Sequence, residues 1–182
     1  AWANQLPLTQ SGWNTGGLAL TEENTEQSEL SSAHYFSPDS LVDTLGLKLV
    51  AGRDFTPDDI FEYNPENVNA TPQSVIITLA LARALAGDDA DPATLVGQRL
   101  FGTSPGSAVI VGVVERLQTP WSNAGEEGER SYILPIRYVA GQFQYAIRTE
   151  PGQVDRVLKT AADTLAGLRN DRVLNSQRTF AE

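Results

Sequence analysis

The sequence contains no cysteine and no methionine, and it has a single histidine, His34. The lack of cysteine excludes disulfides, thiolate zinc sites and a cysteine nucleophile. One histidine removes nearly all histidine-based metal sites and leaves His34 as the one possible base of a Ser-His triad. No apolar run approaches the roughly 18 residues that a membrane-spanning helix needs.

A secretory signal peptide is absent too. Because the chain begins at Ala1 and holds no methionine, we expect it to be a segment of a longer protein whose membrane anchors lie outside it. Positive charge is scarce, since 13 Lys and Arg stand against 23 Asp and Glu and give a formal net charge of −10. This balance argues against nucleic acid and anionic lipid as partners, because both need a Lys/Arg surface.

The common catalytic motifs are also missing. The sequence has no G-x-x-x-x-G-K-[ST] phosphate loop, no G-x-S-x-G elbow and no H-E-x-x-H pair. The acidic runs 58–59, 88–91 and 126–129 are typical of helix starts and solvated loops rather than of cation sites. His34 is most simply a half-buried strand residue with one hydrogen bond. We therefore predict that the chain is not an enzyme and uses no cofactor and no metal.

What is present is an ordinary globular composition, with 41% hydrophobic and 20% charged residues over 182 positions. That length allows one good-sized core or two small lobes. Strands outnumber helices, which predicts an α+β fold with mixed sheets and short helices on one face. A polar stretch at 61–72 marks a possible boundary between two sub-lobes. The predicted strands lie near 28–37, 47–52, 74–78, 98–101, 108–114, 131–139, 143–149 and 171–177, and the predicted helices at 38–45, after 56, at 79–86 and at 151–168.

Three of the helices carry start signals. Ser37 is a possible N-cap followed by Pro38 at the first helical position, and Gly46 ends that helix. Thr56 and Thr78 are the N-caps predicted for the next two helices.

Three further segments carry signals about their position in the fold. The continuous apolar run 108–114 suits a strand covered on both faces. Pro135 places its strand at an edge or a bulge. The amphipathic pattern of 151–168 predicts one buried helix face.

Two tryptophans, Trp13 and Trp121, stand in polar, turn-rich surroundings. One interpretation is that each folds back as a lid on the core. The other is a contact with a partner or cargo, because exposed aromatic side chains supply binding energy at low entropic cost.

An ordered set of motifs resembles a known family. The stretch HYFSPDSLVDTLGLKLVAGRDFTPDD is followed by SVIITLALARAL, LVGQRL and VIVGVVERL, and the set resembles the MacB-like periplasmic core domain of ABC transporter permeases, the MacB/FtsX family. The resemblance spans nearly the whole chain, and Gly-Arg-Asp-Phe is its most specific part. We interpret the signature residues as structural rather than as a binding site. They are Phe36, Ser37, Pro38, Gly46, Gly52, Arg53, Asp54, Phe55 and Gly112.

The resemblance implies one extracytoplasmic domain over residues 1–182, with βαβ-type sub-lobes, between the first and second transmembrane helices of a permease. It implies a periplasmic location at the inner membrane, a cytoplasmic ABC ATPase and a second permease copy as partners, and a peptide, antibiotic or lipoprotein as cargo. The domain would couple ATP hydrolysis mechanically to export or extraction of that cargo.

Two other readings remain open. One is a free periplasmic solute- or peptide-binding module, and the other is a hydrolase that uses His34 with a distant Ser and Asp.

Overall fold

The computed structural model of the chain divides into two compact units, Ala1–Ala146 (unit 1) and Ile147–Glu182 (unit 2), which we describe separately. None of the helices in the described part of the chain is long and apolar enough to cross a membrane. The residues that the structure describes are 1–63, 71–138, 143–168 and 173–180.

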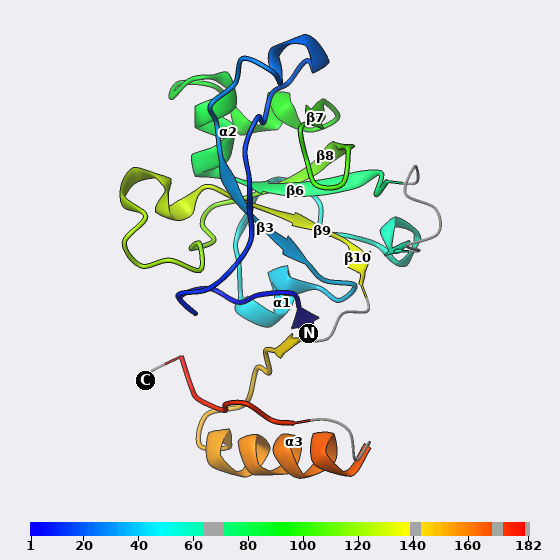
Figure 1. Cartoon of the computed structure of the whole chain (residues 1–182), viewed down its shortest axis with the longest axis vertical. Coiled ribbons are helices and arrows are strands. Elements are labelled where there is room, and N and C mark those ends of the chain that lie inside the picture. The colour runs from blue at the N-terminus through cyan, green and yellow to red at the C-terminus, as the bar shows by residue number, and fades with distance from the viewer. Residues whose placement is uncertain (64–70, 139–142, 169–172, 181–182) are drawn as a thin grey trace. The chain divides into compact units, whose positions relative to one another are not determined.

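A seven-stranded mixed sheet forms the centre of unit 1 (Figure 1). Its strands follow the order β2-β3-β9-β6-β8-β4, and β7 pairs with β8. The β3–β9 and β6–β8 pairs are parallel and the other pairs are antiparallel, which confirms the predicted α+β class with mixed pairing. The bounds are β2 (Asn14–Thr15), β3 (Ser32–Phe36), β4 (Leu49–Gly52), β6 (Ser74–Thr78), β7 (Arg99–Phe101), β8 (Ser107–Val114) and β9 (Ser131–Leu134).

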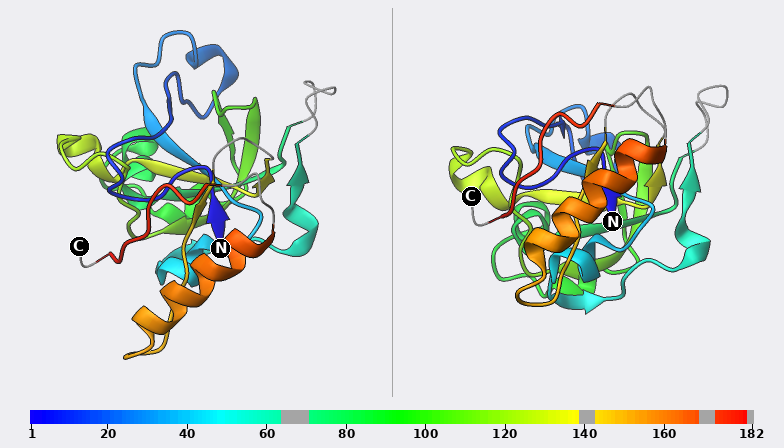
Figure 2. Two further views of the ribbon diagram at one scale, coloured as in Figure 1. Left: turned by 60° about the horizontal axis from the view of Figure 1, so that its bottom comes forward. Right: turned by 90° about the horizontal axis from the view of Figure 1, so that it is seen from below.

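Two short strand pairs complete unit 1. Strand β1 (Trp2–Ala3) pairs with β11 (Gln144–Tyr145), and β5 (Phe61–Glu62) pairs with β10 (Ile136–Arg137). In the views of Figures 1 and 2, the segment that carries β5 extends from one side of the main sheet, beside β10.

Pro135 separates β9 from β10. The strand containing Pro135 was predicted to lie at an edge or a bulge; β9 is not an edge strand, since it lies between β3 and β6, whereas β10 belongs to a two-stranded sheet. Proline cannot donate to a strand ladder, so the chain changes sheets at this residue. The carbonyl oxygen of Pro135 instead accepts a hydrogen bond from the Phe61 N–H at 2.8 Å.

Within the described part of unit 1, the α-helices are α1 (Leu41–Leu45) and α2 (Leu79–Ala86). The Thr78 hydroxyl accepts a hydrogen bond from the Leu81 N–H at 3.3 Å, so the predicted cap of α2 is confirmed. The described residues also form the 3₁₀ turns η1 (Glu22–Asn24), η2 (Pro57–Asp59), η3 (Pro92–Leu95) and η4 (Gly125–Glu129).

Helix α1 begins three residues later than predicted. Its N-cap is Ser40, whose hydroxyl accepts from the Asp43 N–H at 2.9 Å, and not Ser37. The Ser37 N–H extends the strand pairing by donating to the Leu134 carbonyl, and its hydroxyl donates to the Trp2 carbonyl at 2.8 Å. Because these bonds hold Ser37 in the sheet, the next serine starts the helix.

The core lies on both faces of the main sheet, because successive residues of a strand point to opposite sides. Val75 and Ile77 of β6 pack in the cluster that includes Leu81 of α2. Ile76 packs in the other cluster, which includes Leu41 of α1. The two helices therefore cover opposite faces, a detail that differs from the predicted placement on one face. Strand β8 also contributes to both clusters.

Unit 2 contains α3 (Val154–Leu168), the longest helix that the structure describes. Its apolar stripe is only half-buried, and none of its residues is fully buried. The predicted closing strand 171–177 is not formed by its described part, 173–177. The sequence pattern identified the helix but not the extent of its burial. The predicted face also includes Val154 and Leu168, which are exposed; its half-buried members are Val157, Leu158, Ala161, Ala162 and Leu165.

The predicted sub-lobe boundary near 61–72 falls mainly on residues 64–70, which lie outside the described residues. That boundary, and the single domain over 1–182, therefore stay predictions.

Candidate functional site

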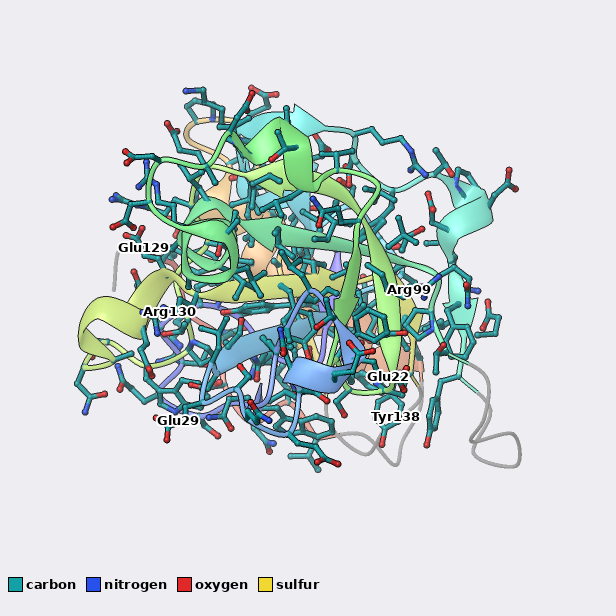
Figure 3. The ribbon with its side chains drawn as sticks, turned by 90° about the horizontal axis from the view of Figure 1, so that it is seen from above. Glu22, Glu29, Arg99, Glu129, Arg130 and Tyr138 are labelled. Carbon is teal, nitrogen blue, oxygen red and sulfur yellow. The ribbon has the colours of Figure 1, made fainter. Side chains whose placement is uncertain are left out.

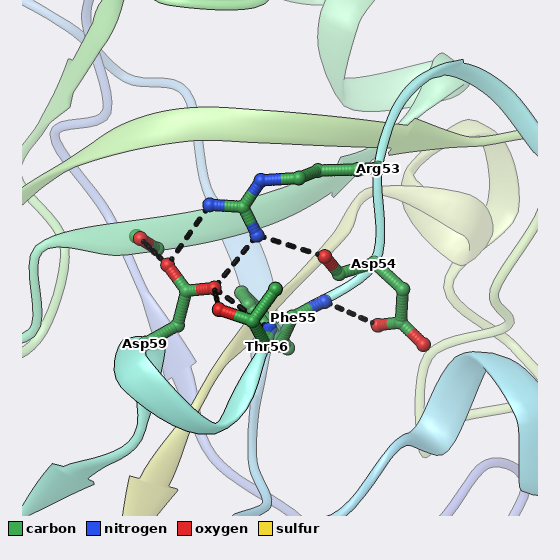
Figure 4. Close-up of polar contacts among 6 residues, drawn as sticks. Arg53, Asp54, Phe55, Thr56 and Asp59 are labelled. Carbon is green, nitrogen blue, oxygen red and sulfur yellow. Dashed lines mark hydrogen bonds and ion pairs between the residues drawn. The ribbon is translucent and has the colours of Figure 1, made fainter.

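The Gly-Arg-Asp-Phe segment, Gly52–Phe55, connects the end of β4 to η2. The Arg53 guanidinium binds the Asp59 carboxylate with both of its terminal nitrogens, Nη1 to Oδ2 at 2.6 Å and Nη2 to Oδ1 at 3.2 Å (Figure 4). Nη1 also donates to the Asp54 carbonyl oxygen at 2.9 Å. Such a two-pronged contact fixes the direction of the guanidinium as well as its distance.

Asp59 is the centre of this network, and 9% of its side chain is exposed. Besides Arg53, its carboxylate accepts from the N–H and the hydroxyl of Thr56, both at 2.8 Å, and from the Ser74 hydroxyl. The hydrogen bond from Arg53 is the main reason that the pKa of Asp59 lies far below its usual range; burial opposes this effect, and the bonds from Ser74 and Thr56 lower the pKa further. Because Ser74 begins β6, Asp59 ties the η2 turn to the central sheet.

Asp54 makes the second connection. Its carboxylate accepts from the Phe55 N–H at 2.7 Å and from the hydroxyl of Ser40, the residue that caps α1. The Phe55 ring packs against the cluster that contains the α1 side chains. One four-residue segment therefore holds α1, η2 and β6 together.

Two glycines let β4 and β8 approach closely beside this segment. Gly52 has a φ of +70°, and a Cβ there would lie 2.2 Å from the Val111 carbonyl oxygen. A Cβ on Gly112 would lie 2.3 Å from the Arg53 carbonyl oxygen. The contact closes with a hydrogen bond from the Arg53 N–H to the Val111 carbonyl at 2.9 Å. These positions therefore require glycine.

The remaining signature residues run from the last residue of β3 to the end of α1. Phe36, Ser37 and Pro38 are buried. Gly46 ends α1 with a φ of +66°, and its N–H donates a hydrogen bond to the Asp43 carbonyl oxygen at 3.1 Å. Over the described ranges, no group of three or more His, Asp or Glu residues could hold a metal ion. The polar side chains of the Gly52–Phe55 junction form hydrogen bonds to neighbouring residues of the protein, as is typical of a structural contact.

A second feature is a groove of about 190 Å³, which we call the aromatic groove. Trp13 is 49% exposed and lies in its wall. Its ring centroid is 6.1 Å from that of Phe36 and 6.2 Å from that of Tyr138. The groove is lined by Trp13, Phe36, Tyr63, Ser104, Pro105, Ile136 and Tyr138.

His34 lies behind the groove wall and is 4% exposed, more buried than the sequence predicted. Its ring stacks on Phe36 with centroids 4.9 Å apart and planes 19° apart. Its Nδ1 lies 2.8 Å from the Thr15 hydroxyl, whereas Nε2 has no partner among the described residues. Burial lowers the pKa of His34 to about 4, so the ring is neutral at neutral pH.

A chain of hydrogen bonds leads from the groove to His34. The Ser104 N–H donates to the Tyr132 hydroxyl, which donates to the Thr15 hydroxyl, both at 3.2 Å. Thr15 in turn faces His34 Nδ1. This series of hydrogen bonds includes no carboxylate, so it lacks the acidic member of a Ser-His-Asp triad.

Trp121 takes a different position from Trp13. It is half-buried and packs against the cluster that contains Leu41 and Val42 of α1. This is the arrangement that the core-lid interpretation describes.

The sequence did not reveal how Trp13 is held. The Gln5 side chain accepts from the Trp13 N–H and donates to the His34 carbonyl at 2.9 Å. Asn4 accepts from the Phe36 N–H at 2.7 Å and donates to the His34 carbonyl at 3.3 Å. These amides occupy the backbone groups of β3 as a neighbouring strand would. A polar N-terminal stretch gives no local signal for such contacts.

Tyr63 and Tyr138 were also missed. They follow β5 and β10, and the Tyr63 N–H donates to the Arg137 carbonyl at 3.2 Å. The pairing of these two strands brings the tyrosines to one place, and only an aromatic residue at the end of each short strand could have hinted at it.

No family model matches the chain, and no curated protein matches its sequence. Solved structures do match. The extracellular domain of the noncanonic ABC-type transporter YknZ from Gram-positive bacteria matches with a TM-score of 0.55 and 15% identity, over 90% of this chain and 75% of that one. The periplasmic region of MacB from Actinobacillus actinomycetemcomitans matches with a TM-score of 0.50 and 16% identity, over 92% of this chain and 66% of that one. The predicted MacB-like fold is thereby confirmed.

Proposed function

We propose that the chain is the non-catalytic extracytoplasmic domain of an ABC transporter permease, placed between the first and second transmembrane helices. The observation that carries this proposal is the likeness in fold, over 90% of the chain, to the extracellular domain of the ABC-type transporter YknZ. The ordered motifs from His34 to Leu117 support it independently, because they were read from the sequence alone.

The proposed role is mechanical. ATP hydrolysis by a cytoplasmic ABC ATPase would move this domain, with a second permease copy, to drive export or extraction of a peptide, antibiotic or lipoprotein from the inner membrane or periplasm. Such coupling needs a body with packed, discrete states rather than a soft chain. The two-sided core of unit 1 and the Gly52–Phe55 junction support that requirement. We propose a structural role for the signature residues for the same reason.

The location can be tested by thiol labelling of the full-length protein. Because this domain has no cysteine, Asp88→Cys introduces its sole thiol at an exposed position. We expect a membrane-impermeant maleimide to label this variant in intact cells. Ala82→Cys, at a buried position of the same helix–loop region, is the matched control and should react only after denaturation. Labelling of Asp88→Cys only after cell lysis would contradict an extracytoplasmic location.

The partner can be tested by affinity purification of the full-length protein from detergent-solubilised membranes. An ABC ATPase should co-purify with it. Recovery of the protein in the soluble periplasmic fraction, without an ATPase, would favour the alternative of a free solute- or peptide-binding module.

A further inference from the structure

The walls of the aromatic groove stand at steep angles to one another. The Tyr63 and Tyr138 rings are 4.9 Å apart at 65°, and the Trp13 and Tyr138 rings are 6.2 Å apart at 71°. Trp13 and Phe36 meet at 89°. Four aromatic rings, which are inclined steeply to one another, therefore line the groove. Aromatic faces carry negative electrostatic potential, and a set of them around a space of this kind favours a cation.

The charge of unit 1 favours a cation as well. Residues 1–146 contain 18 Asp and Glu against 7 Lys and Arg, a formal charge of −11. Five of those seven basic side chains are already ion-paired with carboxylates. Figure 3 shows Glu22, Glu29 and Glu129 in one view with Tyr138 and with two of the basic residues, Arg99 and Arg130. A field of this sign raises the local concentration of cations.

Two described basic residues, on strands whose chain continues into the groove lining, are engaged elsewhere. Arg137 precedes Tyr138 in the sequence and pairs with Glu62 at 2.9 Å. Arg99 donates to the Ser107 hydroxyl at 3.3 Å, and neither arginine lines the groove. His34 behind the Phe36 wall is neutral at neutral pH because its burial lowers its pKa to about 4. Among the residues that the structure describes, none that lines the groove is charged.

We propose that the aromatic groove binds a small organic cation with an alkylated ammonium head group. Trp13, Tyr63 and Tyr138 would face the cation, and Phe36 would close the back. The volume of about 190 Å³ suits one such head group rather than a whole peptide segment. This site follows from the groove alone, and it holds whether or not the chain is a permease domain.

The test compares choline with 3,3-dimethylbutan-1-ol, in which a neutral tert-butyl group replaces the trimethylammonium group. Both are titrated into the 182-residue chain while the indole N–H signal of Trp13 is followed by NMR, with Trp13→Phe used for assignment. We expect choline to bind about tenfold more tightly than its neutral isostere, as cation–π contacts of a partly exposed site allow. Added sodium chloride should weaken choline binding more than that of the alcohol.

Two tyrosine variants complete the test. Tyr138→Leu should weaken choline binding about tenfold and change the affinity for the alcohol little. Tyr145→Leu removes an exposed tyrosine that does not line the groove, and it should change neither affinity. Far-ultraviolet circular dichroism checks that both variants are folded. Equal affinity for choline and the alcohol, no binding of choline, or an equal loss in Tyr145→Leu would overturn the proposal.

Discussion

Unit 1 and unit 2 differ in how their apolar residues are used. Unit 1 buries side chains on both faces of a sheet, and its two short helices each contribute a fully buried leucine. Unit 2 has the longer and more regular amphipathic helix, yet none of its residues is fully buried. The formal charges differ as well, −11 for unit 1 against +1 for unit 2, where five acidic residues stand against six basic ones. An apolar stripe with the correct period thus indicates a helix, whereas its stability depends on what covers the stripe.

Two probes can follow the units separately. All three tryptophans, Trp2, Trp13 and Trp121, lie in unit 1, so their fluorescence reports its unfolding. Helical circular dichroism reports on both units, since α3 has 15 residues against 13 in α1 and α2 together (5 and 8), so a loss of helical signal that fluorescence does not show reports on unit 2.

The largest effect is expected from a methyl group at the β4–β8 contact. Gly52→Ala places a Cβ 2.2 Å from a backbone oxygen at a positive φ, and it should lower the free energy of unfolding of unit 1 by about 4 kcal/mol or more. Urea denaturation followed by tryptophan fluorescence measures this loss. The matched change is Gly167→Ala in α3, where nothing lies within 4 Å, and it should raise helix stability by up to about 1 kcal/mol. A small loss in Gly52→Ala would show that the contact yields easily.

The next effect comes from removing a buried leucine. Leu81 of α2 is fully buried, so Leu81→Ala should cost unit 1 about 3 kcal/mol through lost burial and a cavity. Leu158→Ala in the half-buried stripe of α3 should cost about 1 kcal/mol or less. The same denaturation experiment compares the fluorescence and circular dichroism midpoints. Equal losses would mean that α3 is covered as well as α2, and would remove the contrast between the units.

The third effect depends on pH. His34 has a pKa of about 4 in the folded chain because it is buried, whereas its ordinary value is 6.5. The unfolded chain therefore takes up a proton first as the pH falls. The contribution of neutral His34 to the free energy of unfolding is fully present above pH 6.5. It is lost progressively down to pH 4, by about 3 kcal/mol in total. Denaturation curves of unit 1 at several pH values measure this loss. In His34→Phe the part of the pH dependence within this window should disappear, and its persistence would assign the effect to other groups.

The smallest effect is expected at the Arg53–Asp59 contact. The guanidinium is half exposed, so solvent screening limits the loss in Arg53→Ala to about 1 kcal/mol. Arg53→Lys should recover part of it, because an ammonium group cannot bind both carboxylate oxygens in the same geometry. The comparison in unit 2 is Lys159→Ala, which removes the exposed pair with Asp163 and should leave the circular dichroism midpoint unchanged. If Arg53→Ala lowered the free energy of unfolding no more than Lys159→Ala does, the Arg53–Asp59 contact would have no stabilising role.

The sequence predicted well what local chemistry determines. The cap of α2, the glycine end of α1 and the doubly covered strand β8 follow from residue types within a few positions of one another. The start of α1 was misplaced because Ser37 and Ser40 are equally good caps locally, and only the strand contacts of Ser37 decide between them.

The two candidate sites also differ in whether neighbouring residues in the sequence determine them. The Gly52–Phe55 junction was visible as a contiguous motif. The aromatic groove was not, although Trp13 and Phe36 had been singled out, because its walls come from segments that are far apart in the sequence; Tyr63 and Tyr138, for example, meet through the β5–β10 pairing. The amides of Asn4 and Gln5 that hold Trp13 and β3 in place are likewise products of tertiary structure.

The hydrogen-bond chain behind the groove connects the groove surface to a buried ring. The Ser104 N–H donates to the Tyr132 hydroxyl, the Tyr132 hydroxyl donates to the Thr15 hydroxyl, and Thr15 shares a hydrogen bond with His34 Nδ1. Because the Thr15 hydroxyl can either donate to Nδ1 or accept from it, the position of its proton and the tautomer of His34 are coupled. Imidazole ¹⁵N shifts of His34 would consequently report on events at Ser104, although the imidazole itself is buried behind the groove wall.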